Sequence, residues 1–379
     1  MLIPILAFQS AINVRAETLW RSHIIDPRGT SGSIALDSQD NPHISFHSGS
    51  ALKYASWTGT NWTIQTVDPA GSSGPLLLDS QDRPHISYVV NGTLIYASWY
   101  GSKWNKQTLD QDGAEDVSLA LDSNDKPHLS YFKDGALKYA ELNNSAWSIQ
   151  TVSEGQVIGG NDIVLDKNDC AQIIYREQVD YHTFNIKYVS WTESEWLVQT
   201  SFMYIDDIGN MVIDSDGRPH LTYILSDSLV YAYWNGSVWI AQTVDSNVAP
   251  YPGLLASDSH DKPIIVFYKY DKGLPVVTYA KWTGSSWDFQ IVSDSHNSYG
   301  QPAFVNSMVV GSNGRVHLVT DTVVGTENTA YFYGDLSYAT FDTQPLTPNS
   351  FPTTIIAVVI GVVVIGTVLL LYFKKRRHN

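Results

Sequence analysis

Residues 33–68 read SIALDSQDNPHISFHSGSALKYASWTGTNWTIQTVD, and the pattern within this stretch decides the fold. Its apolar residues fall into four short runs, SIAL, HISFHS, ALKYASW and WTIQTV, which alternate with polar residues or are rich in β-branched and aromatic residues. Such runs are typical of strands. Turn residues separate them at DSQDNP, GS and TGTN, so the stretch predicts four antiparallel strands joined by tight turns.

The four-strand unit recurs along the chain at intervals of 42 to 53 residues. A repeat of this length that holds four short strands is typical of a β-propeller blade. Two markers of the unit occur seven times and a third occurs six times, which predicts seven blades. The markers are the residue that begins the first turn (Asp37, Asp79, Asp122, Asp166, Asp214, Asp258, Gly311), the tyrosine of the third strand (Tyr54, Tyr96, Tyr139, Tyr188, Tyr231, Tyr279, Tyr338) and the tryptophan of the fourth strand (Trp62, Trp104, Trp147, Trp196, Trp239, Trp287).

The last repeat ends at Phe341 without a fourth-strand tryptophan, and a lone tryptophan, Trp20, precedes the first repeat. Residues 19–26, LWRSHIID, match the fourth strand WTIQTVD of the first repeat. We therefore expect the N-terminal segment to complete the last blade, so that no open sheet edge remains at the seam. The predicted fold is an all-β, seven-bladed β-propeller over residues 17–342, closed by an N-terminal strand.

The composition excludes some classes of protein. The formal net charge is −15 over 379 residues, and an acidic surface repels phosphate backbones, so we expect no nucleic-acid partner. Cys170 is the single cysteine, which excludes an intrachain disulfide. The stability of the fold must therefore come from packing and ring closure.

The ends of the chain carry signals for membrane attachment. Residues 353–373 contain no charge and are long enough to cross a bilayer, and the KKRR that follows predicts a cytoplasmic C-terminal tail, residues 374–379. Residues 1–16 resemble a signal peptide, and residues 343–352 form a proline-punctuated linker. The sequence thus predicts a single-pass protein of the cell membrane with an extracellular propeller.

The two faces of the predicted propeller differ in their loops. Turns between the first and second strands and between the third and fourth strands share one face, here called the bottom face, and they are uniform. Turns between the second and third strands and the links between blades share the top face, and they vary, as loops that carry function do. Because the linker can span at most about 35 Å, we expect the bottom face to lie toward the membrane.

The longest top-face loops are rich in tyrosine, histidine and acidic residues, which suit a sugar or a peptide ligand. Polar loops that merely shield the central channel would look the same. The candidate ligand-binding residues are Arg176, Glu177, Tyr181, His182, Tyr204, Asp206, Asp207, Tyr251, Tyr268, Tyr270, His296 and Tyr299. We predict no catalytic set, no cofactor and no metal, because neither GxSxG, HExxH nor a phosphate loop occurs.

Three recurring motifs have structural interpretations. The histidines His43, His85, His128, His220 and His317 lie in successive blades, too far apart to share a metal, so we expect buried strand histidines. The DSxD turns offer fewer oxygens than calcium requires, and aspartate favours turns on its own account. Glycosylation sequons occur at Asn61, Asn91, Asn143 and Asn235.

The repeats DSQDRPHISY, LIYASWYGSKW and WTIQTVD resemble those of seven-bladed propellers in uncharacterised prokaryotic surface proteins. These are similar to the BNR/Asp-box sialidase-like superfamily and, more loosely, to fungal fucose-binding lectins. The resemblance covers residues 19–342 and implies the fold. Of the Asp-box, SxDxGxxW, only the glycine and the tryptophan survive. A sialidase would need three converging arginines, whereas Arg83, Arg218 and Arg315 fall in bottom-face turns and only Arg28 and Arg176 fall on top.

Three functions are compatible with these observations. The first is a membrane-anchored binding propeller that recognises a glycan, a peptide or a surface protein through its top-face loops. The second is a sialidase-like glycan hydrolase or lyase in the same pocket. The third is a structural cell-envelope protein without a discrete ligand. Because no catalytic set can be drawn from the sequence, the first and third are favoured.

Overall fold

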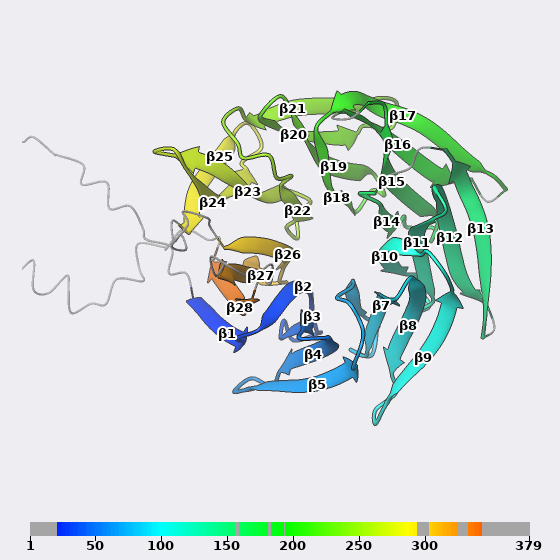
Figure 1. Cartoon of the computed structure of the whole chain (residues 1–379). Helices are drawn as coiled ribbons and strands as arrows, with labels where there is room; N and C mark the ends of the chain where they lie inside the picture. Colours follow the sequence, from blue (N-terminus) through cyan, green and yellow to red (C-terminus); the bar gives the residue numbers. More distant parts are fainter. Residues whose placement is uncertain are drawn as a thin grey trace, which may run out of the picture. The chain divides into compact units, whose positions relative to one another are not determined.

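The computed structural model describes residues 21–143, 145–155, 159–180, 183–192, 194–293, 303–324 and 333–342. They form 28 strands in seven four-stranded antiparallel sheets, set like blades around a central axis (Figure 1). The prediction of an all-β, seven-bladed propeller is confirmed. Within the described ranges, no helix is long and apolar enough to cross a membrane. Residues 1–16 and 343–379, with the predicted signal peptide, linker and membrane span, lie outside those ranges.

Each blade contains one inner strand, two middle strands and one outer strand, and chain order follows blade order except at the seam. The strands of blades one to three are β2 Gly29–Leu36, β3 Pro42–Ser48, β4 Ala51–Trp57, β5 Trp62–Asp68; β6 Leu76–Leu78, β7 Pro84–Val90, β8 Thr93–Trp99, β9 Trp104–Asp110; and β10 Glu115–Leu121, β11 Pro127–Lys133, β12 Ala136–Asn143, β13 Ala146–Glu154. Those of blades four and five are β14 Asp162–Leu165, β15 Ala171–Gln178, β16 Phe184–Trp191, β17 Trp196–Ile205; and β18 Asp207–Ile213, β19 Pro219–Leu225, β20 Ser228–Trp234, β21 Trp239–Asp245. Those of blades six and seven are β22 Leu254–Ser257, β23 Pro263–Asp271, β24 Leu274–Trp282, β25 Trp287–Ser293; and β26 Phe304–Val310, β27 Arg315–Val324, β28 Tyr333–Asp342, with β1 Arg21–Asp26 as the outer strand.

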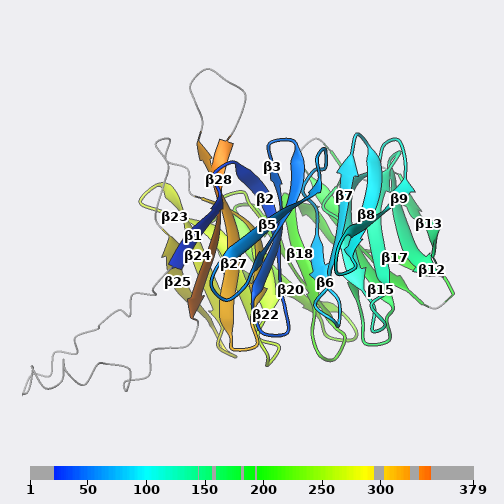
Figure 2. The same ribbon diagram turned by 90° about the horizontal axis from the view of Figure 1, so that it is seen from below.

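Blade seven is built from both ends of the propeller sequence. Its strand order is β1-β28-β27-β26, and β1 pairs antiparallel with β28, with His23 opposite Tyr338. The side view shows β1 lying against β28 beside the first blade (Figure 2). The predicted closure by the N-terminal strand is therefore confirmed for residues 21–26, while Trp20 itself lies outside the described residues.

The hydrophobic core lies between the blades rather than within any one of them. It consists of seven clusters, and each joins two neighbouring blades. At the seam, Val319 and Leu336 of blade seven pack with Ile44 and Phe46 of blade one, and all four are fully buried. Each such side chain contributes roughly 1.5 to 3 kcal/mol relative to exposure. No blade can therefore bury its apolar faces without both neighbours.

Aromatic contacts explain why the fourth-strand tryptophan recurs. At six junctions the tryptophan of one blade packs against the third-strand tyrosine of the preceding blade, with ring centroids 4.9 to 5.5 Å apart. The pair Trp62–Tyr338 forms this contact across the seam. Edge-to-face pairs of this kind contribute about 0.5 to 1.5 kcal/mol beyond their buried area.

The DSxD turns bind each blade to the next on the bottom face. Within a turn, the Asp37 carboxylate accepts the backbone N–H groups of Gln39 and Asn41 at 2.9 and 2.8 Å. The last aspartate of a turn accepts both the backbone N–H and the hydroxyl of the preceding blade's turn serine. This serine–aspartate clamp occurs at five junctions: Ser38–Asp82, Ser80–Asp125, Ser123–Asp169, Ser215–Asp261 and, across the seam, Ser312–Asp40. At the two other junctions glycine replaces the aspartate, as Gly217 and Gly314.

The clamp at the seam can be tested with a matched pair of serine variants. Ser312→Ala removes the 2.6 Å hydroxyl contact to Asp40. We expect it to lower the free energy of unfolding by about 0.5 to 1.5 kcal/mol. Ser259→Ala alters the same turn position where the facing residue is Gly314, so it should change stability much less. Urea unfolding measures both variants, and equal losses would contradict a stabilising role of the clamp.

Candidate functional site

A chain of hydrogen bonds recurs behind the bottom-face turns. In blade two, His85 Nε2 lies 3.2 Å from the Asp79 carboxylate, and His85 Nδ1 contacts the Tyr96 hydroxyl. Because a carboxylate only accepts, the imidazole donates through Nε2 and accepts the tyrosine proton at Nδ1. Blade five repeats this arrangement with Asp214, His220 and Tyr231. In blades one and three the histidine–tyrosine contact is kept in His43–Tyr54 and His128–Tyr139, while Nε2 lies 3.6 Å from the carboxylates of Asp37 and Asp122.

This hydrogen-bonded set of aspartate, histidine and tyrosine has a structural role. It does not act as a tyrosine nucleophile activated by a histidine base. Burial lowers the pKa of His85 and His220, so both imidazoles are neutral near pH 7. Burial also raises the pKa of Tyr96 and Tyr231, which keeps both phenols protonated. In blade four Gln172 replaces the histidine, and the Tyr188 hydroxyl donates to its side-chain oxygen at 2.9 Å. The strand histidines are thus buried core residues, as the sequence predicts.

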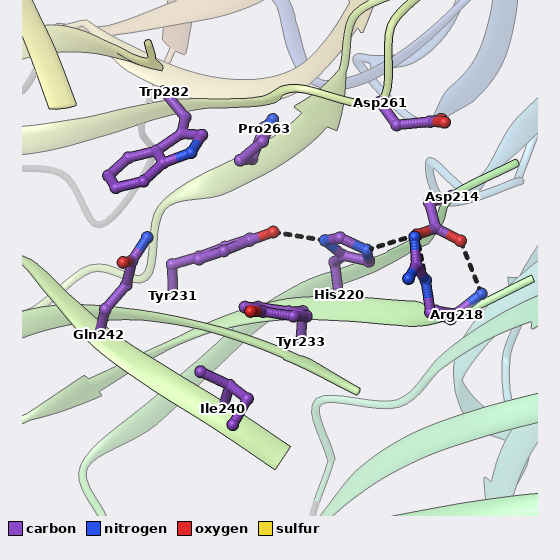
Figure 3. Close-up of a pocket in the computed structure, with 10 residues that line it drawn as sticks. All are labelled: Asp214, Arg218, His220, Tyr231, Tyr233, Ile240, Gln242, Asp261, Pro263 and Trp282. Carbon is purple, nitrogen blue, oxygen red and sulfur yellow. Dashed lines mark hydrogen bonds and ion pairs between the residues drawn. The ribbon is translucent and has the colours of Figure 1, made fainter. Parts of the chain in front are cut away.

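Two clefts open on the bottom face, between blades two and three and between blades five and six. The second has a volume of about 270 Å³ and is shown in Figure 3. It is lined by Asp214, Arg218, His220, Tyr231, Tyr233, Ile240, Gln242, Asp261, Pro263 and Trp282. The first, of about 400 Å³, is lined by Gln81, Arg83, His85, Tyr96, Ser98, Tyr100, Gln107, Asn124, Asp125, Lys126, Pro127, Leu142 and Ser145.

The two clefts occupy equivalent positions, and an arginine follows the turn in each. Arg218 donates from Nε to Asp214 at 2.7 Å and pairs through Nη2 with Asp216 (Figure 3 shows the Asp214 contact). Arg83 is bound in the same way, to the Asp79 carboxylate and through Nη2 to the side-chain oxygen of Gln81. Both arginine side chains remain about 40% exposed. The clefts therefore present fixed guanidinium groups to solvent.

On the top face, an arginine and several acids gather at the inner ends of blades three to five. Arg176, near the end of β15, forms an ion pair with Asp207 at the start of β18. Its guanidinium lies 5.0 Å from the centre of the Phe184 ring. Arg176 Nη2 and the Asp116 carboxylate both lie within 3.5 Å of the point where a Cβ would stand at Gly159. Burial raises the pKa of Asp207, and Arg176 opposes this shift.

Asp162 belongs to a ring of polar side chains on the inner strands. It accepts hydrogen bonds from the Ser118 hydroxyl of blade three and the Met211 N–H of blade five, at 2.8 and 2.9 Å. Burial, with the nearby charge of Asp116, raises its pKa to about 6. Asn210 holds the equivalent position one blade further and accepts the Leu255 N–H in the same way. Asp162 is therefore an inter-blade bridge, and its oxygens are engaged.

The described members of the twelve predicted residues fall into two groups, one near Arg176 and one near blade six. Four of the twelve, Tyr181, His182, His296 and Tyr299, lie outside the described residues. Arg176 and Asp207 are in contact, and Glu177 beside them pairs with Lys187 at 3.0 Å. The Asp206 carboxylate accepts the Ser226 N–H at 2.6 Å, and Tyr204 is 60% exposed.

The remaining predicted residues gather near blade six. Tyr251 packs edge-on against Tyr268, with ring centroids 5.5 Å apart. Tyr268 is only 6% exposed, and its hydroxyl contacts the Ala303 oxygen and the Val305 N–H. Tyr268 therefore joins blade six to blade seven. Tyr270 is 38% exposed, farther along β23.

Sequence reasoning missed the two clefts. Neither is lined by any of the twelve residues, and both lie on the face that the uniform turns led us to set aside. The signal that could have found them is the position after the turn, where the seven blades carry Asn41, Arg83, Lys126, Cys170, Arg218, Lys262 and Arg315, while aspartate precedes it and proline follows it in most blades. Arg83 and Arg218 belong to different clefts, each paired with its own aspartate, so these two do not converge as sialidase arginines would.

Comparisons with known proteins agree on the fold alone. No protein-family model matches the chain, and no curated protein matches it. The chain is similar in structure to virginiamycin B lyase from Staphylococcus aureus, with 7% identity over 85% of this chain and 99% of that chain and a TM-score of 0.58. It is also similar to YCF48 bound to D1 peptide, with 10% identity over 86% of this chain and 97% of that chain and a TM-score of 0.54. A third similar structure is the polysaccharide lyase Uly1, with 9% identity over 82% of this chain and 89% of that chain and a TM-score of 0.50. The fold is thus shared by lyases and by a peptide-binding protein.

The raised pKa of Asp162 predicts that Asp162→Asn increases the free energy of unfolding, and that the size of this increase depends on pH. A carboxyl whose folded pKa exceeds its unfolded value of about 3.9 contributes stability below pH 4 that is lost as pH rises through 6. Asparagine keeps one oxygen to accept the Met211 N–H, as Asn210 accepts the Leu255 N–H, and its amide nitrogen would donate to the Ser118 hydroxyl oxygen instead of accepting from it. We expect the variant to be more stable at pH 7.5 by roughly 1 to 3 kcal/mol, and no more stable than the native chain at pH 4. Urea unfolding at both pH values measures this, and a loss at pH 7.5 would contradict it.

Proposed function

We propose that this protein is a membrane-anchored binding propeller that recognises a segment of a neighbouring surface protein through the top face of blades four and five. The observation that carries this proposal is the pair Met203 and Tyr204 at the end of β17, whose side chains are 63% and 60% exposed. Large apolar side chains left in solvent beside polar groups are characteristic of interaction surfaces.

The backbone of Tyr204 supports the same proposal. Its φ is +59°, in the left-handed region that bulky residues rarely adopt. Strain of this kind, on the order of 1 kcal/mol or more, persists where the surrounding structure enforces it, often at binding sites. The strand β17 contains ten residues, whereas the outer strands β5, β9 and β21 contain seven. The extension holds the tyrosine out at the rim.

Charged groups next to this extension complete a mixed surface. Asp206 follows it directly and is exposed, and the Arg176–Asp207 ion pair lies in the same link between blades four and five. Tyrosine, methionine and arginine are enriched at protein–protein interfaces. The peptide bound to YCF48 is a precedent for the fold only, since the identity is 10%.

The membrane part of the proposal rests on the sequence. Residues 353–373 would span the bilayer and residues 374–379 would lie in the cytoplasm, with the propeller outside the cell. The short linker, residues 343–352, would keep the bottom face toward the membrane and leave the top face available to partners. On an exported domain, Asn61, Asn143 and Asn235 would be glycosylation sites of the bottom rim.

A glycan hydrolase or lyase is the second candidate, and the raised pKa of Asp162 and Asp207 is the observation in its favour. Against it, Asp162 is engaged with Ser118 and Met211, and Asp207 with Arg176, so neither carboxyl is held ready for a substrate. A structural envelope protein without a ligand would have no need of a strained, exposed tyrosine.

Site-specific cross-linking tests the proposed surface. A photoreactive benzoylphenylalanine at position 204 of the full chain, in membranes of the source cells, should cross-link one discrete protein partner. Because Tyr204 is a large exposed aromatic side chain of this surface, Tyr204→Ala should weaken binding of the identified partner by about 2 kcal/mol, or roughly thirtyfold. Position 238 supplies the matched control, because Val238 is 54% exposed in the bottom-face turn between β20 and β21 and lines neither cleft. Equal cross-linking from both positions, or none from position 204, would contradict the proposal.

A further inference from the structure

We propose that the two bottom-face clefts are equivalent saccharide-binding sites, each taking a neutral pyranose ring. The inference goes beyond the proposed function, which uses the opposite face of the propeller. It rests on the repetition of one arrangement at two junctions, on the chemistry of the side chains and on their local charge.

The repetition concerns residues of the same type at matching positions. Each cleft contains the turn arginine, the histidine and tyrosine behind it, a fourth-strand glutamine and, from the next blade, the clamp aspartate and a proline. Arg83 corresponds to Arg218 and Gln107 corresponds to Gln242. Volumes of about 270 and 400 Å³ are near the lower end of the range for small-molecule pockets, which suits a ligand of one or two rings.

The guanidinium groups are held ready for a ligand. Asp214 and Asp216 fix Nε and Nη2 of Arg218, which leaves Nη1 without a partner among the described residues. A guanidinium fixed in this way loses little conformational freedom when a hydroxyl group of a ligand accepts from it. The Gln107 oxygen already accepts the Trp147 indole N–H at 3.1 Å, so its amide nitrogen is left as a second donor.

Each cleft also contains an aromatic side chain that can cover an apolar ring face. Tyr233 and Trp282 line the cleft between blades five and six (Figure 3). In the other cleft the Arg83 guanidinium lies 5.6 Å from the centre of the exposed Tyr100 ring. A pyranose has a C–H face that packs on such rings and hydroxyls at its edge that hydrogen-bond with arginine, glutamine and aspartate. This combination of groups is present in both clefts.

The local charge favours a neutral ligand over an anionic one. Three carboxylates, Asp214, Asp216 and Asp261, lie around the single Arg218. In the other cleft Arg83 and Lys126 are offset by their ion pairs with Asp79 and Glu141, and Asp125 adds a further negative charge. An acidic surrounding repels phosphates and acidic sugars but still offers acceptors to hydroxyl groups.

The other blades supply substitutions that remove a site and keep the turn. In blade one Asn41 stands in place of the arginine, and its amide donates to Asp37 at 2.9 Å. Arg83→Asn and Arg218→Asn should therefore fold with a satisfied turn. Leu142 occupies the position in the first cleft that Trp282 occupies in the second. Trp282→Leu therefore removes an aromatic ring from the second cleft and replaces it with the residue found at the equivalent position of the first.

The test uses the full chain in detergent and an array of neutral and acidic glycans, followed by calorimetric titration with the methyl glycoside of the preferred terminal sugar. We expect a neutral sugar to bind with two sites per chain. Arg83→Asn and Arg218→Asn should each leave one site, and the double variant should bind at least tenfold more weakly. Trp282→Leu should weaken one of the two sites. Melting temperatures of the variants report whether each one is folded.

Several results would overturn the inference: no glycan bound on the array, a stoichiometry of one, a preference for acidic glycans or aromatic peptides, or a double variant that binds as the native chain does. Tyr204→Ala is the control on the opposite face and should leave sugar binding unchanged. Because the cross-linking at position 204 does not involve the clefts, failure of this inference and failure of the proposed function can be told apart.

Discussion

The pairing of β1 with β28 is the constraint on which the rest of this structure depends. Each blade buries its apolar faces against its two neighbours, and without β1 the outer edge of β28 in blade seven would remain a row of unpaired backbone groups. A six-residue strand from the other end of the chain closes that edge. Further contacts across the same seam include the Trp62–Tyr338 pair, the Ser312–Asp40 clamp and the Ile34 N–H donated to the Ser307 hydroxyl. Blades seven and one are thus joined at the outer rim, on the bottom face and at the inner strands.

The contacts between blades also explain the sequence repeat. The turn serine and aspartate, the strand tyrosine and the outer tryptophan recur because each contacts its counterpart in the next blade. Exceptions to the pattern are therefore informative. Lys167 and Gly217 omit the clamp between blades four and five, where the chain also carries the extended β17 and the strained Tyr204. One of the two junctions without the clamp is thus the one that carries the irregular top-face surface.

The fold was predictable from sequence to the level of strand order, because tryptophan, tyrosine and DSxD recur at fixed offsets and Trp20 has no repeat of its own. The candidate sites were predictable only in part. Arg176 and Asp207 lie 31 residues apart, and only the geometry of adjacent blades brings them together. Tyr268 is of a residue type that is common at binding surfaces, yet its side chain is buried where it contacts blade seven, and no local sequence pattern reveals that. The clefts depend on which side chain follows each turn and on the facing blade, so the uniformity of the turns concealed Arg83 and Arg218.

The most direct test of the account is the stability of the propeller with and without its closing strand. Thermal unfolding of residues 17–342 should be compared with that of residues 27–342, in the absence and presence of a synthetic peptide of residues 17–26. The account predicts that removal of the strand lowers the melting temperature by about 10 °C or more and that excess peptide restores it saturably. Equal melting temperatures for the two chains would contradict the claim that the N-terminal strand holds the ring closed.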